Sequence, residues 1–143
     1  MYNLTKIKIE RPVSEVFEAF VDPSRIGGFW FSSSSERWEE GKVITLRYDE
    51  YEAQGEIYIT KIDPNKKIEF HWGPNKEGNR VTMTLNQLGD SESTIEITEE
   101  GFSEDDEEII RVMLDNKEGW VYMLTCLKGY LEHGVNLRAS LLH

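Results

Sequence analysis

The sequence is poor in cysteine, in long apolar runs and in positive charge. Its 143 residues include one cysteine, Cys126, which has no partner for an internal disulfide bond. No apolar run approaches the roughly 18 residues of a membrane span, and the N-terminal segment MYNLTKIKIE lacks the apolar core of a secretory signal. These absences favour an intracellular protein with no membrane span, and we expect it to be cytoplasmic.

The shortage of positive charge narrows the range of partners. Sixteen lysines and arginines stand against 27 acidic residues, so that the net charge is −11. Nucleic-acid binding depends mainly on cations that neutralise phosphates, and anionic membrane surfaces attract basic segments. The composition therefore argues against both as partners. The densest acidic run, 104–108, lacks the D-x-D-x-D-G spacing of a calcium loop.

The most regular pattern in the chain is an apolar stripe near its C-terminus. Large apolar side chains recur there every three, four or seven positions, which predicts one face of a helix. Ser103 is the expected N-cap and Gly134 the expected stop. A single helix of about 43 Å would be longer than a strand of about 33 Å, so we expect a bend or break near 115–119. Asp115 and Glu118 would form a new capping box there. The stripe comprises Met113, Trp120, Leu124, Leu127 and Leu131.

The chain before this helix reads mainly as strands. A strand at 3–10 leads to a short helix that begins after Pro12 and ends at Asp22-Pro23, followed by a second short helix or tight loop around Gly27-Gly28. From residue 36 onward, apolar and polar residues alternate in segments joined by short turns, which is typical of antiparallel neighbours with one packed face. In the segment 53–62, Ile62 does not follow the alternation of Ile57 and Ile59. The expected strands are 36–38, 43–48, 53–62, 68–72, 81–85 and 95–97.

This order of elements predicts an α+β fold. A curved antiparallel sheet of about seven strands would wrap around the long C-terminal helix, with two short helices after the first strand. Residues 1–143 are expected to form a single domain, because the chain is long enough to bury one core and contains neither repeats nor a linker.

Three segments carry a family resemblance. They are PVSEVFEAFVDPSRIGGFWF at 12–31, GEIYITKIDPNKKIEFHW at 55–72 and EGWVYMLTCLKGYLEHG at 118–134. In this order they resemble the START-like (SRPBCC, helix-grip) superfamily and, within it, the stand-alone bacterial type of the heat-shock-protein-90 ATPase activator-homologue family. The resemblance implies a birch-pollen-allergen-like fold with a cavity for apolar molecules between sheet and helix. Some superfamily members are cyclases or hydrolases, and co-chaperone activity belongs to longer eukaryotic members.

Large rings predominate among the residues expected to face the sheet–helix interface. Such a set either fills the core or lines a pocket with one or two polar tips, and the sequence leaves both readings open. An entrance for a ligand is expected near 29–31. The candidate ligand-binding residues are Phe29, Trp30, Trp38, Tyr48, Ile57, Phe70, Trp72, Met83, Trp120, Leu124 and Leu127.

No catalytic residues, metal ligands or cofactor-binding motifs stand out. The histidines at 71, 133 and 143 lack metal-ligand spacing. Cys126 lies beside the buried stripe, where a thiol is usually inert. Three strand carboxylates alternate with the apolar face and are expected to be solvated: Glu52, Glu56 and Glu69.

The leading functional hypothesis is a protein that binds a small hydrophobic or aromatic ligand. The first alternative, a cyclase- or hydrolase-type enzyme, requires an inward Glu or His with a polar partner, and the predicted faces place none there. The second alternative is a chaperone-linked protein-interaction module, which requires an exposed apolar patch. The sequence identifies neither the ligand nor a protein partner.

Overall fold

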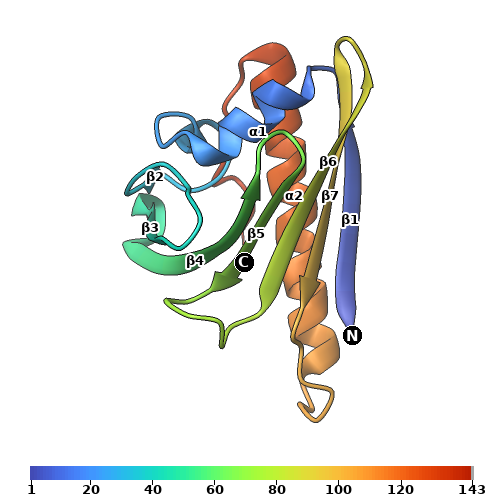
Figure 1. Cartoon of the computed structure of the whole chain (residues 1–143). Coiled ribbons are helices and arrows are strands. Elements are labelled where there is room, and N and C mark those ends of the chain that lie inside the picture. Colours follow the sequence, from blue (N-terminus) through green and yellow to red (C-terminus); the bar gives the residue numbers. More distant parts are fainter. Residues whose placement is uncertain (143) are drawn as a thin grey trace.

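The computed structural model describes residues 1–142 of the chain. Figure 1 shows a strongly curved sheet and a long helix that lies against it. The elements in chain order are β1 (Tyr2–Ile9), α1 (Val13–Val21), the 3-10 helix η1 (Ile26–Gly28), β2 (Ser33–Ser34), β3 (Val43–Tyr48), the 3-10 helix η2 (Asp49–Tyr51), β4 (Ala53–Asp63), β5 (Lys67–Trp72), β6 (Arg80–Gly89), β7 (Glu92–Glu100) and α2 (Ile109–His133).

The seven strands form one antiparallel sheet in the order β1-β7-β6-β5-β4-β3-β2. Strands β3 to β7 follow one another as hairpins, in agreement with the short turns in the sequence. The first strand pairs with the last along its whole length, from Tyr2 opposite Glu100 to Ile9 opposite Ser93. The predicted α+β helix-grip fold is therefore confirmed.

One face of the sheet is buried, and its residues alternate as the sequence predicts. They pack against α1 and the second half of α2 in one hydrophobic cluster. In β4 the pairing register shifts between Ile59 and Lys61, and this β-bulge explains why Ile62 is out of phase. The buried pairs are Ile57 and Ile59 in β4, Ile68 and Phe70 in β5, Val81 and Met83 in β6, and Ile95 and Ile97 in β7.

Helix α2 is continuous from Ile109 to His133, so the predicted break at 115–119 is wrong, as is the capping box of Asp115 and Glu118. Its 25 residues span about 38 Å at about 1.5 Å each. The 11 residues of β4 span about 36 Å, nearly the same length. The helix therefore fits the sheet without a break.

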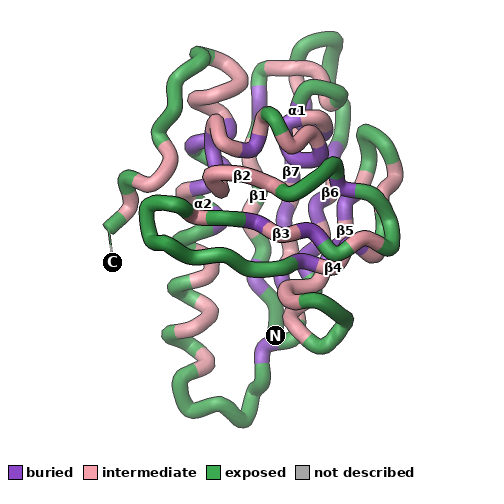
Figure 2. Tube along the Cα trace, turned by 90° about the vertical axis from the view of Figure 1, so that its left-hand side faces the viewer, coloured by how far each residue is buried: buried purple, intermediate pink, exposed green. Residues whose placement is uncertain are grey.

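The two ends of α2 differ in how well the sequence predicts them. The chain does not enter the helix at Ser103 but first makes tight turns, in which the Asp106 carboxylate accepts the Glu108 N–H at 2.8 Å. The helix ends as predicted at Gly134, which is left-handed with φ 65°. Its first half is largely exposed (Figure 2), and its buried residues begin at Trp120. Within residues 1–142 no helix is long and apolar enough to cross a membrane.

The strand predicted at 36–38 is also wrong. The pairing segment is the two-residue strand β2, Ser33–Ser34, which joins the edge of the sheet at β3. Trp38 instead leaves the sheet and buries its ring in the core, where its N–H donates to Ser34 Oγ at 3.2 Å. A buried ring with a satisfied N–H replaces backbone pairing there.

The loop between α1 and β2 passes close to α2. The predicted second helix is only the single turn η1. It contains Gly28 because a Cβ there would lie 2.3 Å from the Tyr130 ring. Directly after it, Phe29 stacks on Tyr130 with ring centroids 5.8 Å apart. This close approach holds the aromatic loop against the helix.

Candidate functional site

A pocket of about 460 Å³ opens where β5 and β7 meet residues 115–123 of α2 and the C-terminal segment. Its volume is within the range of small-molecule sites. Seven of its fifteen lining residues are aromatic. The lining residues with charged or amide side chains are Glu99, Asp115, Asn116 and Arg138.

Glu99 of β7 is a buried carboxylate in the wall of this pocket, with only 1% of its surface exposed. Oε1 accepts the Trp120 indole N–H at 2.9 Å, and Oε2 accepts the Trp72 indole N–H at 3.1 Å. The Asn79 amide donates to Oε2 at 3.3 Å, and the Asn116 amide lies 3.2 Å from both oxygens. All four partners are N–H donors, which is the set that an ionised carboxylate accepts.

Three tryptophans from separate segments form one wall of the pocket. The ring centroids of Trp30 and Trp120 are 5.6 Å apart, those of Trp72 and Trp120 6.0 Å, and those of Trp30 and Trp72 6.4 Å. These separations are typical of favourable aromatic pairs. Because two of the indoles donate to Glu99, the carboxylate fixes their orientation.

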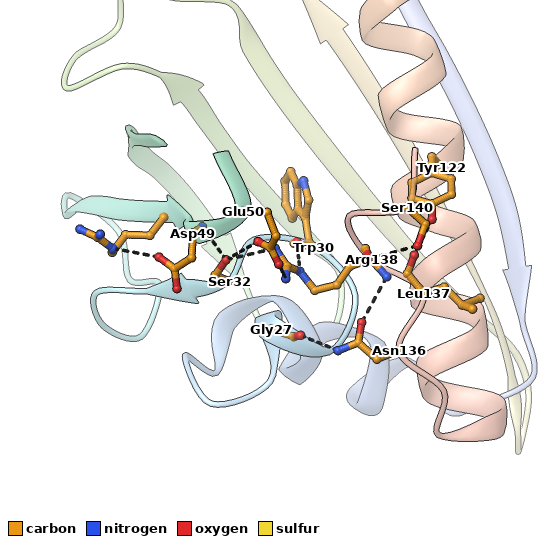
Figure 3. Close-up of polar contacts among 11 residues, drawn as sticks. Gly27, Trp30, Ser32, Asp49, Glu50, Tyr122, Asn136, Leu137, Arg138 and Ser140 are labelled. Carbon is orange, nitrogen blue, oxygen red and sulfur yellow. Dashed lines mark hydrogen bonds and ion pairs between the residues drawn. The ribbon is translucent and has the colours of Figure 1, made fainter. Parts of the chain in front are cut away.

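The C-terminal segment also lines the pocket. Arg138 anchors this segment (Figure 3). Its guanidinium donates through Nε to the Trp30 carbonyl at 2.6 Å and through Nη2 to Ser32 Oγ at 3.1 Å. Glu50 of η2 accepts from Nη2 at 2.9 Å with one oxygen and from Nη1 with the other. The guanidinium also lies over the Tyr48 ring, 5.0 Å from its centroid.

The charges of this anchor neutralise each other. Hydrogen bonds from Arg138 are the main cause that lowers the pKa of Glu50 to about 2. The same contact raises the pKa of the Arg138 guanidinium. Burial raises the pKa of the neighbouring Tyr48 hydroxyl. Both members of the ion pair are therefore charged at neutral pH, and the phenol is not.

Gly119 is an exposed residue of α2 that lines the pocket and has no side chain to enter it. The helix residues three and four positions away on either side, Asp115, Asn116, Tyr122 and Met123, all line the pocket, so position 119 faces it as well. A Cβ built at Gly119 would meet no atom within 4 Å. Glycine inside a helix is unfavourable by about 1 kcal/mol relative to alanine, and at this position it enlarges the pocket.

The comparisons with known proteins place the chain in a family and agree with its fold. Residues 10–132 match the family described as Activator of Hsp90 ATPase homolog 1-like protein. The chain belongs to this family. Protein SSP2350 from Staphylococcus saprophyticus is 48% identical, with a TM-score of 0.86 over 98% of both chains.

More distant structures share the fold alone. The Aha1 dimer from Colwellia psychrerythraea is 19% identical, with a TM-score of 0.80 over 94% of this chain and 98% of that one. CalU16 from Micromonospora echinospora is 19% identical, with a TM-score of 0.71 over 93% and 77% of the two chains. No curated protein sequence matches the chain.

In this member of the Aha1-like family, the eleven predicted ligand-binding residues fall into two groups. Five line the pocket: Phe29, Trp30, Tyr48, Trp72 and Trp120. Six lie in the packed core: Trp38, Ile57, Phe70, Met83, Leu124 and Leu127. Phe31, expected at the entrance, packs between Trp30 and Tyr48 with centroids 4.7 and 5.5 Å away. The core is thus filled beside the second half of α2, and the pocket lies beside residues 115–123 of the helix.

Among the described residues, those considered in the sequence as catalytic or metal-binding candidates do not line this pocket. Cys126 is buried, and burial raises the pKa of its thiol. His71 Nδ1 lies 2.9 Å from the Gly78 carbonyl, and His143 lies outside the described residues. No group of three or more His, Cys, Asp or Glu side chains within residues 1–142 could hold a metal ion. Glu52 and Glu56 are exposed, and Glu69 is half-buried and accepts the Thr60 hydroxyl at 2.8 Å.

The sequence reading missed the main polar residues of the pocket. The prediction that no ionisable group faces inward is wrong, because Glu99 does. It follows the buried Ile95 and Ile97 at the same period of two, a signal that was available in the sequence. The position of Asn116 could also have been predicted from the sequence, since it lies one helical turn before Trp120. Arg138 had no local signal, because only the path of the C-terminal segment brings it to the pocket.

Proposed function

We propose that this protein binds a small aromatic or apolar molecule in the pocket beside residues 115–123 of α2. The observation that supports it best is the combination of aromatic walls with the gap at Gly119. Gly119 is exposed and lines the pocket, so the missing side chain leaves room beside the aromatic walls. Here the unfilled space adjoins a buried carboxylate and three tryptophans.

The size of the pocket agrees with moderate affinity. A ligand that buries about 300 Å² of apolar surface would gain at most about 7 kcal/mol at about 25 cal/mol per Å², before the costs of ordering. This corresponds to binding in the micromolar range. No special polar contact is needed to reach it.

The decisive experiment fills the gap and asks whether binding is lost. Gly119→Leu places an apolar side chain in the pocket, whereas Thr125→Leu adds the same side chain at an exposed position of the same helix. Aromatic and lipid-like compounds that raise the Tm of the wild type should raise that of Thr125→Leu equally and that of Gly119→Leu much less. Equal shifts for all three proteins would contradict the proposal.

Native mass spectrometry of the protein purified from its host provides an independent test. A bound mass that is retained by Thr125→Leu and absent from Gly119→Leu would identify a natural occupant of the pocket. A clean unliganded mass together with no stabilising compound would contradict the proposal and favour the interaction module.

An enzyme of the cyclase or hydrolase kind is supported by one observation, the inward Glu99 with polar partners. A general base must have a free lone pair within reach of the substrate proton. The oxygens of Glu99 already accept from four side chains. The geometry therefore favours a fixed negative charge over a proton acceptor, and we place binding ahead of catalysis.

The interaction module is supported by a different face of α2. Ile110, Leu114 and Val121 are exposed there and follow helical spacing. Leu114→Lys should abolish binding to a bacterial Hsp90-type chaperone if this face is used, and should leave ligand binding in the pocket unchanged. Absence of chaperone binding by the wild type at tens of micromolar would contradict this second candidate.

A further inference from the structure

We infer that the ligand of this pocket carries a positive charge, as a protonated amine or a quaternary ammonium group attached to an apolar or aromatic body. The inference rests on the proposed function and names the chemical class of the ligand. It follows from the charges that line the pocket, from the hydrogen bonds of the buried carboxylate and from the nature of the walls.

The pocket has an uncompensated negative charge. Its charged lining residues are Glu99, Asp115 and Arg138. Arg138 is already matched by the Glu50 carboxylate, which it meets with both terminal nitrogens. Glu99 takes part in none of the ion pairs within residues 1–142, and neither does Asp115. Glu99 is therefore a buried carboxylate that a ligand cation could neutralise, and Asp115 adds a second, exposed one.

A buried carboxylate without a cation is an unusual arrangement. Removing a charge from water is costly unless the charge is paired. Hydrogen bonds from two indoles and two amides offset part of this cost for Glu99. A ligand cation in the pocket would supply the missing positive charge, and it needs no lone pair on the carboxylate to do so.

The walls of the pocket suit an organic cation better than a metal ion. The faces of tryptophan and tyrosine carry negative electrostatic potential and attract ammonium groups within about 6 Å of the ring centre. Trp72 and Trp120 donate to Glu99, and Trp30 packs against both of them. Tyr51 and Tyr122 also line the pocket. The Tyr48 face is already occupied by Arg138. A metal ion would require more oxygen ligands than these walls provide.

The overall charge acts in the same direction. A net charge of −11 raises the local concentration of cations around the protein and lowers that of anions. Asp115 lies exposed on α2 at the mouth of the pocket, where a charge acts on an arriving ligand. Fatty acids and other carboxylates would therefore be disfavoured, although their chains would fit apolar walls.

The test compares three naphthalene compounds of similar size and different charge: naphthylmethyl-trimethylammonium, naphthylmethanol and naphthylacetate. Their affinities for the wild-type protein are measured by tryptophan fluorescence and by ligand-observed NMR up to millimolar concentration. The cation should bind about tenfold more tightly than the alcohol, and the acetate should bind most weakly. Gly119→Leu should reduce the binding of all three.

Matched variants separate the charge of the pocket from the charge of the molecule. Asp115→Asn should weaken binding of the cation by about two- to fivefold and leave the affinity for the alcohol unchanged. Glu118→Gln removes one exposed carboxylate from the same helix outside the pocket and should have no effect. Glu99→Gln is a less suitable variant, because its amide N–H groups would face other N–H donors.

The outcomes distinguish the two proposals. If the alcohol or the acetate binds as tightly as the cation, and Gly119→Leu blocks them, the pocket binds ligands but the inference about charge is wrong. If the cation binds best but Asp115→Asn and Glu118→Gln weaken it equally, the charge preference does not arise in the pocket, and the inference is wrong again. If none of the three compounds binds, both proposals fail.

Discussion

Individual side chains in this protein serve either packing or the pocket, and glycines show the difference most clearly. Gly28 and Gly119 both lack a side chain, but for opposite reasons. At Gly28 a Cβ would collide with the Tyr130 ring, whereas at Gly119 it would enter open space. The first glycine permits close packing, and the second preserves a cavity.

This difference gives a prediction about stability. Gly119→Ala should raise the free energy of unfolding by about 1 kcal/mol, because alanine is the better helix former and meets no atom within 4 Å. Gly129→Ala is the matched control on the same helix. A Cβ there would lie 3.0 Å from Leu137 and 3.2 Å from Val135, so its gain should be smaller or reversed. Urea unfolding measures both, and a loss of stability in Gly119→Ala would contradict the open geometry.

The ion pair of Glu50 and Arg138 predicts a dependence on pH. The pKa of Glu50 is lowered to about 2 in the folded protein, so the unfolded state binds the proton more readily. The stabilisation from this pair is complete above the ordinary pKa of a glutamate and is lost as the pH falls through about 2. The difference in unfolding free energy between the wild type and Glu50→Gln should therefore be constant at pH 5–8 and shrink below about pH 4.5.

Glu52→Gln removes an exposed carboxylate from the same turn and controls for the change in net charge. Urea unfolding at pH 7, 5, 4 and 3 is the measurement. A difference that stayed constant down to pH 3 for Glu50→Gln would show that the pair does not form in solution.

Trp120 connects packing with the pocket. It is 5% exposed, and its indole N–H donates to Glu99 at 2.9 Å. Trp120→Ala should lower the free energy of unfolding by about 3–5 kcal/mol. Trp120→Phe keeps a ring and removes the donor, so it should cost about 1–3 kcal/mol, the usual penalty for a buried acceptor that loses its partner. Equal stability of Trp120→Phe and the wild type would mean that the hydrogen bond to Glu99 contributes nothing.

At the scale of elements, α2 has two functions along its length. From Trp120 to Leu127 its inner face is buried and grips the sheet. Before Trp120 it leaves the core, and Asp115, Asn116 and Gly119 line the pocket together with Trp120, Tyr122 and Met123. One uninterrupted helix therefore links the packed core rigidly to the wall of the candidate site.

The end of this helix can be tested separately. Gly134 adopts a left-handed conformation (φ 65°) and its N–H donates to the Gly129 and Tyr130 carbonyls. Gly134→Ala should lower the free energy of unfolding by about 1 kcal/mol. This is opposite in sign to the effect expected for Gly119→Ala, although both changes add one methyl group, one inside α2 and the other at its C-terminal cap. If chemical unfolding showed that both variants change the free energy of unfolding in the same direction, the left-handed cap at Gly134 or the open position at Gly119 would be contradicted.

At the scale of the whole molecule, the pocket exists because the chain closes on itself. Arg138 ties the C-terminal segment to the Trp30 carbonyl and to Glu50, and Asn136 donates to the Gly27 carbonyl at 3.0 Å. The Tyr122 hydroxyl donates to the Leu137 carbonyl from the helix side. Figure 3 shows these contacts bridging α2 and the loops around β2 and η2.

Removing this segment should open the pocket without unfolding the protein. A chain that ends at residue 134 retains all strands and α2, so its far-UV circular dichroism should match that of the full chain. Trp30 and Trp120 would lose the cover of the C-terminal segment, and tryptophan emission should shift to the red with stronger quenching by acrylamide. Arg138→Gln should produce a smaller change in the same direction. Unchanged emission in both variants would show that the segment does not cover the tryptophans.

Local patterns in the sequence are enough to predict the fold of this protein and much of its core. Period-two alternation in β4 to β7, short turns and a C-terminal apolar stripe are local signals, and each depends on neighbours in the chain. In β7 the same alternation places Glu99 on the buried face with Ile95 and Ile97, although the sequence analysis predicted no inward carboxylate. Six of the eleven candidate ligand-binding residues, among them Phe70 and Leu127, lie in the core. The sequence does not separate them from the five pocket residues, because an apolar position has the same pattern whether its neighbour is protein or ligand.

The position of the pocket and the pairing of its charges depend on contacts that form only in the folded chain. The gap at Gly119 depends on what stands opposite the helix, and the partners of Glu99 come from β5, the β5–β6 turn and α2. Arg138 reaches Glu50 across 88 residues of chain. Such contacts form between segments that are brought together only by folding, so no local pattern encodes them, and they determine the charge and shape of the candidate site.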